Sequence, residues 1–249
     1  MVHIAGSTVL VTGGNRGIGH ALVEEALSRG ARRVYAGTRT PWTHPDTRVT
    51  PLLLDITDST QIRSAATTVE SLDILVNNAG IALYDDLTDR SAIERQLAVN
   101  LFGPYEMTRA FRVLLERSGG AIVNNLSLAA LAPVPLSPAY AISKAAALSM
   151  TQSLRLRAAE HGVTVHAVLT GPTDTDMNRG LEIPKVAPEI VARAIFDGVE
   201  KGEEDIFPDP VSETIADAWR NGAAKALERE FAQLAGMPVP DAANPDGDR

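Results

Sequence analysis

Two side chains whose types and spacing could transfer a proton stand near the middle of the chain. Tyr140 and Lys144 are four residues apart in an Ala-rich stretch that predicts a helix, so they would share one helix face. Their ordinary pKa values, about 10 and about 10.4, are too high for proton transfer at neutral pH. Positive charge beside a tyrosine favours the phenolate, so Lys144, together with a second positive charge beside it, would make Tyr140 a usable proton donor or acceptor. Ser127, thirteen residues before Tyr140, could donate a hydrogen bond to an oxygen that develops negative charge.

A second group of residues has the pattern of a phosphate-binding loop. Gly13, Gly17 and Gly19 lie between an apolar run at 9–11 and a helical pattern at 18–29. Glycines allow a tight turn and a close approach of the backbone, and the N–H groups at the start of a helix attract phosphate. The pattern predicts a dinucleotide site, and the alternative is a Gly-rich turn that binds nothing.

The elements that would position these residues alternate between strands and helices. Apolar, β-branched runs predict strands at 9–11, 34–36, 49–54, 72–76, 121–125, 163–169 and 206–207. Amphipathic patterns predict helices at 18–29, 58–69, 88–116 with a kink near Gly103-Pro104, 137–161, 187–202 and 212–234. This alternation predicts an α/β fold, a Rossmann-type doubly wound parallel sheet of about seven strands with helices on both faces. Residues 1–235 would form one dinucleotide-binding and catalytic domain, and residues 236–249, rich in Pro, Asp and Gly, a disordered tail.

From the glycine loop to Thr175, the sequence resembles the short-chain dehydrogenase/reductase family. The spacing of the three glycines, the segment Asn77-Asn78-Ala79-Gly80, the pair Tyr140 and Lys144, and Gly171-Pro172 with Thr175 match family motifs in the family's order. The resemblance implies an oxidoreductase that moves a hydride between nicotinamide and a carbonyl or secondary-alcohol carbon. It implies a catalytic set of Asn100, Ser127, Tyr140 and Lys144, in which Asn100 distorts its helix and supports a water chain reaching Lys144.

The resemblance also implies a set of cofactor contacts on the loops after the strands. These are Gly13, Asn15, Arg16, Gly17, Ile18, Gly19, Arg39, Asp55, Ile56, Asn77, Ala79, Gly80, Tyr140, Lys144, Gly171, Thr173 and Thr175. A carboxylate after the second strand would favour NAD, but Arg39 stands there, and Arg16 offers a second cation. We therefore predict NADP(H) as the cofactor, unless both arginines are merely solvated. Asp55 could instead cap the helix that starts nearby.

Three departures from the family pattern bear on the substrate and the assembly. Thr170 stands where the family usually has Pro, and only a short segment separates Thr175 from the helix predicted at 187–202, which predicts an open site. The usual Gly-rich end of the last strand is missing. The side chains expected at the pocket are mostly apolar and favour a hydrophobic carbonyl or alcohol substrate; they are Leu128, Ala129, Val134, Leu136, Met177 and Leu181. By resemblance we expect a homodimer or homotetramer.

Composition narrows the remaining classes. The chain has no Cys, which excludes disulfides and thiol catalysis, and its five His lack metal-ligand spacing, so no metal site is expected. A net charge of −8 without a basic run argues against nucleic acid, and the lack of a secretion signal or a long apolar run favours a cytoplasmic protein that does not enter membranes. The leading hypothesis is an NADP(H)-dependent ketone or aldehyde reductase, a carbonyl reductase. The alternative is an NADP(H)-binding sensor or scaffold without turnover; epimerase, dehydratase and enoyl-reductase chemistry fit the length and the Tyr-Lys spacing less well.

Overall fold

The seven strands form a single parallel sheet, with the order β3-β2-β1-β4-β5-β6-β7, in a computed structural model that describes residues 2–234. The strands are β1 Thr8–Thr12, β2 Arg33–Thr38, β3 Val49–Leu53, β4 Ile74–Asn77, β5 Ala121–Asn125, β6 Thr164–Val168 and β7 Asp205–Ile206. The order reverses between β1 and β4, where open parallel sheets bind ligands beyond the carboxyl ends of their strands. The prediction of a doubly wound α/β fold of about seven strands is confirmed.

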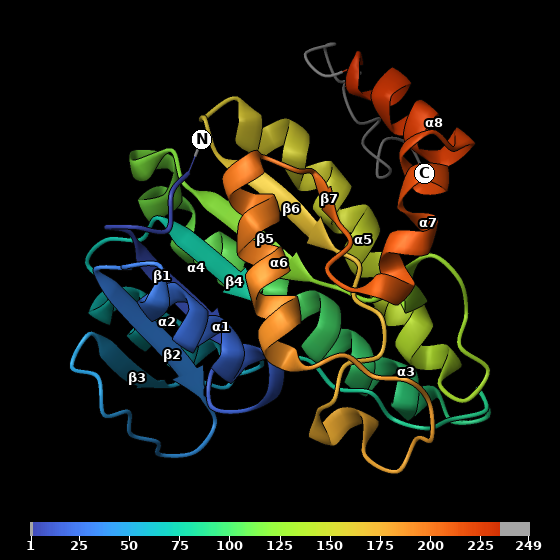
Figure 1. The fold of residues 1–249 in the computed structure, drawn as a ribbon, viewed down its shortest axis with the longest axis horizontal. Helices are drawn as coiled ribbons and strands as arrows, with labels where there is room; N and C mark the ends of the chain where they lie inside the picture. The colour runs from blue at the N-terminus through green and yellow to red at the C-terminus, as the bar shows by residue number, and fades with distance from the viewer. Residues whose placement is uncertain (1, 235–249) are drawn as a thin grey trace, which may run out of the picture.

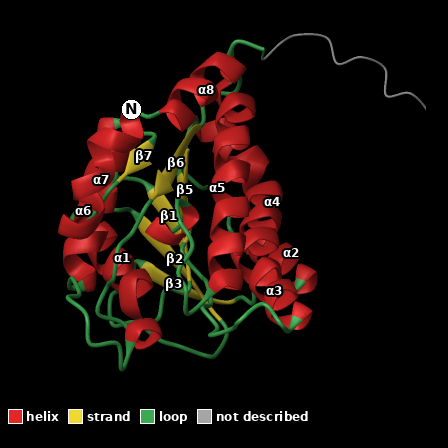
Figure 2. Ribbon diagram, turned by 90° about the vertical axis from the view of Figure 1, so that its right-hand side faces the viewer, coloured by secondary structure: helices red, strands yellow, loops and turns green. Residues whose placement is uncertain are grey.

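Helices cover both faces of the sheet, as Figures 1 and 2 show. α1 and α6 pack on one face, while α2, α4 and α5 cover the other. The helices are α1 Gly17–Ser28, α2 Ser59–Thr68, α3 Arg90–Leu97, α4 Gly103–Ser118, α5 Pro138–Ala159, α6 Pro188–Lys201, α7 Pro210–Arg220 and α8 Ala223–Ala232. Each face buries its own apolar cluster, which holds Phe196 on the α6 side and Phe111 on the α4 side.

The helical stretch expected at 88–116 is interrupted one turn earlier than its Gly103-Pro104 pair suggested. α3 ends at Leu97, a π-helical turn spans Ala98–Phe102, and α4 begins at Gly103. Pro104 lies in the first turn of α4, where its missing N–H has no helical partner to lose. The distortion is therefore centred on Asn100, as the family resemblance implied.

The single helix expected at 212–234 is wrong, because two helices occupy this region. α7 begins early, at Pro210, because the Asp209 side chain accepts the amides of Val211 and Ser212 and caps the helix. The chain then becomes extended at Gly222 (φ −81°, ψ 165°), which precedes α8. The tail expected at 236–249 lies outside the described residues.

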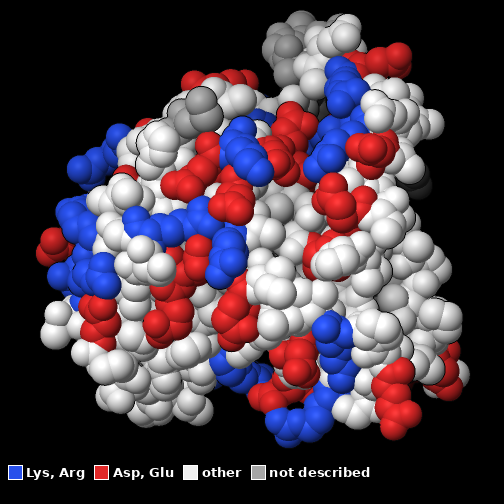
Figure 3. Space-filling view, viewed as in Figure 1, with Lys and Arg blue, Asp and Glu red and all other residues white. Residues whose placement is uncertain are grey.

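The molecular surface carries both signs of charge. Figure 3 shows Lys and Arg interleaved with Asp and Glu over one face. Within residues 2–234, every helix is too short or too polar to cross a bilayer.

Candidate active site

Three of the four expected catalytic side chains meet at the carboxyl end of β5. Ser127 stands two residues after the end of β5, and its hydroxyl lies beside the Tyr140 side chain, whose pKa it lowers. Tyr140 and Lys144 lie one turn apart on α5, with the Lys144 Nζ 5.7 Å from the centre of the Tyr140 ring. The Lys144 ammonium donates to the Asn125 carbonyl at 2.9 Å. A proton donor, a hydroxyl and a buried cation therefore share one small region.

Asn100 connects this region to the loop after β4. Its side-chain amide donates to the Ile81 carbonyl and to the Ser143 hydroxyl, both at 2.9 Å, and its Oδ1 accepts the Ile81 amide at 2.9 Å. The Ser143 hydroxyl donates in turn to the Tyr140 carbonyl at 2.7 Å. A Cβ built on Gly80 would lie 3.1 Å from Asn100 Oδ1 and 3.7 Å from Lys144 Nζ. The π-helical turn thus places Asn100 beside the helix that carries Tyr140 and Lys144.

Burial changes the proton affinity of both titratable groups in the direction that opposes charge. It raises the pKa of Tyr140 to about 12, partly offset by the neighbouring Ser127 hydroxyl, which lowers that pKa. It lowers the pKa of Lys144 to about 8. Both shifts have the same cause, since each charged form loses hydration. Lys144 alone therefore does not bring the pKa of Tyr140 down, and a further positive charge is needed for a phenolate near neutral pH.

The glycine loop depends on residues that have no Cβ. Gly13 and Gly17 have φ values of +69° and +52°, a region that side-chain-bearing residues rarely adopt. A Cβ on Gly19 would lie 2.0 Å from the Gly13 carbonyl oxygen, and one on Gly17 would lie 3.1 Å from Thr175 Cγ2. A side chain at either position would therefore crowd the loop, and the bare backbone at the start of α1 fits a pyrophosphate. Asn15 and Ile18 belong to this same loop and helix start.

The two arginines expected to select the cofactor are both exposed. Arg39 follows β2 directly. Arg16, in the glycine loop, forms an exposed ion pair with Asp176 at 3.4 Å. Asp176 begins a 3₁₀ turn after β6, so this pair joins the two loops on either side of the expected dinucleotide site.

The two residues expected to contact the adenine, Asp55 and Ile56, differ in their surroundings. Asp55 does not cap α2, because Asp58 does so; the Asp55 carboxylate instead accepts the amide and hydroxyl of Thr57. The Ile56 side chain is buried, and a Cβ on Gly103 would collide with it at 2.5 Å. Both residues nevertheless follow β3 at the carboxyl edge.

The segment after β4 faces the expected dinucleotide site with its backbone more than with its side chains. The Asn77 side chain points into the protein, where it donates to Asn124 Oδ1 at 2.9 Å. The Ala79 amide donates to Thr12 Oγ1 at 3.0 Å, which holds this segment against the glycine loop. Any contact between Asn77 and a dinucleotide would therefore use its backbone.

The segment after β6 is fixed by a residue that sequence reasoning missed. The buried Asp209 carboxylate accepts the Gly171 amide at 2.7 Å, and a Cβ on Gly171 would lie 2.5 Å from Asp209 Oδ1. The Thr173 hydroxyl donates to the Gly171 carbonyl at 3.3 Å, and Thr175 follows at the glycine loop. Asp209 gave no sequence signal because a lone aspartate before proline is common in turns.

Comparison with known proteins places this geometry in a family. Residues 7–185 match the family model described as short chain dehydrogenase. The chain belongs to the short-chain dehydrogenase family. A curated relative, the short chain dehydrogenase pigC of Monascus ruber, is 33% identical over an alignment that covers 71% of this chain and 66% of that protein.

Two further similarities are informative. The crystal structure of a short chain dehydrogenase from Burkholderia cenocepacia J2315 in complex with NADP is 36% identical, with a TM-score of 0.84, and covers 92% of this chain and 98% of that chain. The cyclic-di-GMP-binding biofilm dispersal mediator protein of Escherichia coli (strain K12) is 33% identical over 70% of this chain and 76% of that protein. Family members therefore include proteins named for roles other than oxidoreduction.

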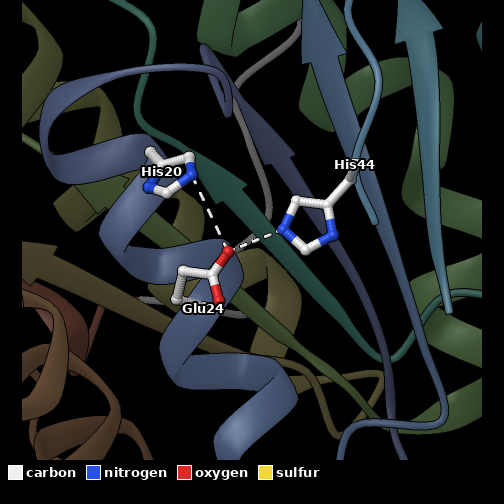
Figure 4. Close-up of side chains that lie close together, drawn as sticks. All are labelled: His20, Glu24 and His44. Atoms are coloured by element: carbon white, nitrogen blue, oxygen red, sulfur yellow. Dashed lines mark hydrogen bonds and ion pairs between the residues drawn. The ribbon is translucent and has the colours of Figure 1, made fainter. Parts of the chain in front are cut away.

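A cluster of His20, Glu24 and His44, which the sequence did not reveal, holds the loop after β2 of this short-chain dehydrogenase against α1. Figure 4 shows Glu24 between His20 and His44. His44 Nδ1 accepts the Asp46 amide at 3.1 Å, so its Nε2 carries the ring proton and donates to Glu24 at 2.6 Å. A metal ion would need the lone pair of that Nε2, which the ring proton occupies. The cluster therefore holds the loop that follows Arg39 in place by hydrogen bonds.

Proposed function

We propose that this short-chain dehydrogenase is an NADP(H)-dependent oxidoreductase that reduces ketones or aldehydes. The observation that carries the proposal is the meeting of Ser127, Tyr140 and Lys144 at the same sheet edge as the glycine loop. In a parallel sheet both groups open onto one crevice, so a bound dinucleotide and a small carbonyl compound would share it.

Each side chain has a distinct role in the proposed reaction. When bound, the nicotinamide supplies a hydride to the carbonyl carbon, and its oxidised form adds a positive charge beside Tyr140. The Ser127 hydroxyl donates a hydrogen bond to the substrate oxygen as negative charge develops on it. Tyr140 donates its proton to that oxygen, and Lys144, held near it, stabilises the resulting phenolate. Asn100 holds the loop after β4 against α5 and keeps the two helix residues in place.

The choice of NADP(H) is supported by Arg39 and Arg16. Both are exposed cations at the loops where the ribose end of the dinucleotide would lie, and arginine binds phosphate through paired hydrogen bonds. The similarity to a solved family member in complex with NADP supports the same choice.

The substrate is proposed to be hydrophobic, and the protein to be a homodimer or homotetramer. Large apolar side chains are exposed on the loops after β4, β5 and β6, among them Tyr84, Leu136 and Met177. Phe102 and Tyr105, at the start of α4, are also exposed and would suit contact with a second copy.

The test is consumption of NADPH with a panel of aldehydes, ketones and diketones, with NADH in parallel. We expect turnover that prefers NADPH and falls at least about a thousandfold in Tyr140→Phe, which keeps the ring but removes the proton. Equal rates for wild type and Tyr140→Phe would contradict the proposed mechanism.

A nucleotide-binding protein without turnover is the second candidate. The similarity to a protein named as a cyclic-di-GMP-binding mediator favours it. Tight NADPH binding measured by calorimetry, together with the absence of turnover across the whole panel, would support this candidate over the reductase.

A further inference from the structure

Asn125, the last residue of β5, makes three polar contacts that lead to three different parts of the site. Its backbone carbonyl accepts the Lys144 ammonium at 2.9 Å. Its side-chain Oδ1 accepts the Thr170 hydroxyl at 2.8 Å, and its Nδ2 donates to Asn78 Oδ1 at 2.9 Å. Asn125 is 8% exposed and Thr170 is 5% exposed, so water competes little for these bonds.

The chain of hydrogen bonds continues to the glycine loop. The side-chain Nδ2 of Asn78 donates to the Thr12 carbonyl at 2.9 Å. The backbone N–H of Asn78 donates to Thr12 Oγ1 at 3.0 Å. Thr12 ends β1, immediately before Gly13. The chain therefore crosses the carboxyl edge of β6, β5, β4 and β1, from the segment beside Gly171 to the start of the phosphate loop.

The chemistry of the groups allows only one direction for this chain. A carbonyl can only accept, so the amide nitrogen of Asn78 must face Thr12 and its oxygen must face Asn125. The amide nitrogen of Asn125 then faces Asn78, and its oxygen is left for the Thr170 hydroxyl. Hydrogen bonds that run in one direction polarise one another, so the loss of one end weakens the rest.

Thr170 supplies the end of the chain where the family usually has Pro, which has no side-chain donor. A Pro at this position would leave Asn125 Oδ1 buried without this donor. The hydroxyl of Thr170 is thus matched to the amide of Asn125.

We propose that Asn125 is a positioning residue that couples both ends of the dinucleotide site to Lys144. Its side chain holds the segment before Gly171 and the segment that supports the glycine loop, while its carbonyl fixes the Lys144 ammonium. This proposal rests on the proposed reductase function. A movement of either loop displaces the Asn125 backbone and therefore the acceptor that orients Lys144.

The neighbouring residue on the strand provides a matched control. Asn124 points to the opposite face of β5, where its Nδ2 donates to Thr151 Oγ1 at 2.9 Å. Thr151 is fully buried on α5, seven residues after Lys144, and its hydroxyl donates to the Ala147 carbonyl within that helix and not to Asn125 or Thr170. Thr170→Val and Thr151→Val therefore each remove one buried hydrogen bond between a threonine hydroxyl and an asparagine side chain, in which Thr170 donates and Thr151 accepts. Only the first bond belongs to the proposed chain.

The experiment compares Thr170→Val, Thr170→Ser and Thr151→Val for kcat, for KM with NADPH, and for the titration of Lys144. The last is followed by NMR of protein labelled at the lysine Cε carbons, where Lys144 stands apart because burial lowers its pKa to about 8. We expect Thr170→Val to lower kcat about tenfold with a smaller change in KM, because a small misplacement of a catalytic group is costly. The Lys144 midpoint should fall further, since its ammonium loses a fixed acceptor.

Thr170→Ser, which keeps the hydroxyl, should restore both values, and Thr151→Val should change neither. Equal kcat and equal Lys144 midpoints in the two valine variants would overturn the proposal and leave Asn125 with a structural role only. If wild type turns over no carbonyl compound, the reductase function fails, and the Lys144 midpoint still decides whether Asn125 positions this lysine.

Discussion

The ammonium of Lys144 lies 5.7 Å from the centre of the Tyr140 ring, and donates to the carbonyl of Asn125. This arrangement places a buried cation beside a proton donor, and the Lys144 ammonium loses its hydration as a result. The same lysine therefore contributes to the proposed reaction and destabilises the fold, and the two effects can be separated by substitution.

Lys144→Met should stabilise the cofactor-free protein and lower its activity. Burial lowers the folded-state pKa of Lys144 to about 8 from an ordinary value of 10.5. Between these values the unfolded chain binds more protons, so the stability of wild type rises with pH across this window. The gain in stability from Lys144→Met is thus largest below pH 8 and shrinks toward pH 10.5. Thermal unfolding measures this gain, since each kcal/mol should raise the melting temperature by about 2–4 °C. Its kcat should fall at least about a hundredfold. Equal melting temperatures at pH 7 would contradict this assignment.

Arg39→Ala should remove the preference for NADPH. Loss of a hydrogen-bonded pair between a cation and a phosphate should cost about 1.5–3 kcal/mol in NADPH binding, with little effect on NADH. Calorimetry with both cofactors measures this directly. Asp176→Asn is the informative companion, because it frees Arg16 from its ion pair and should tighten NADPH binding slightly. Parallel losses for NADH and NADPH in Arg39→Ala would mean that Arg39 supports the fold instead.

Gly19→Ala should weaken the binding of both cofactors, by about tenfold or more. The added Cβ would lie 2.0 Å from the Gly13 carbonyl oxygen, so the phosphate loop must move. Ser28→Ala, at the exposed end of the same helix, serves as the control and should bind normally. Fluorescence of bound NADPH provides the measurement, and unchanged binding in Gly19→Ala would place the dinucleotide elsewhere.

Asp209→Ala should destabilise the protein by about 2–4 kcal/mol, because it removes a buried carboxylate that accepts the amides of Gly171, Val211 and Ser212, the last of them fully buried. Asp58→Ala removes a similar helix cap where water can replace the carboxylate, and should cost clearly less stability. Chemical denaturation of both variants gives the comparison. Similar losses would show that Asp209 acts only as a helix cap.

The sequence predicted the parts of the molecule that depend on local pattern. Apolar runs revealed all seven strands, and the four-residue spacing of Tyr140 and Lys144 brought them to one helix face. The positions that escaped prediction depend on partners distant in the chain. The π-helical turn is tied to Ile81 through Asn100, and the amide of Asn125 makes sense only once Thr170 and Asn78 lie beside it. The division between α7 and α8 was missed because the apolar periodicity continues across Gly222.

The two edges of the sheet limit how copies of this protein can meet. Pro51 lies in the edge strand β3 and cannot donate to a further strand, and β7 at the other edge has only two residues. A sheet that ends in this way offers a poor template for added strands, which protects the chain from edge-to-edge aggregation while it folds. Any association between copies would therefore use helix surfaces, where side chains rather than backbone decide the partner.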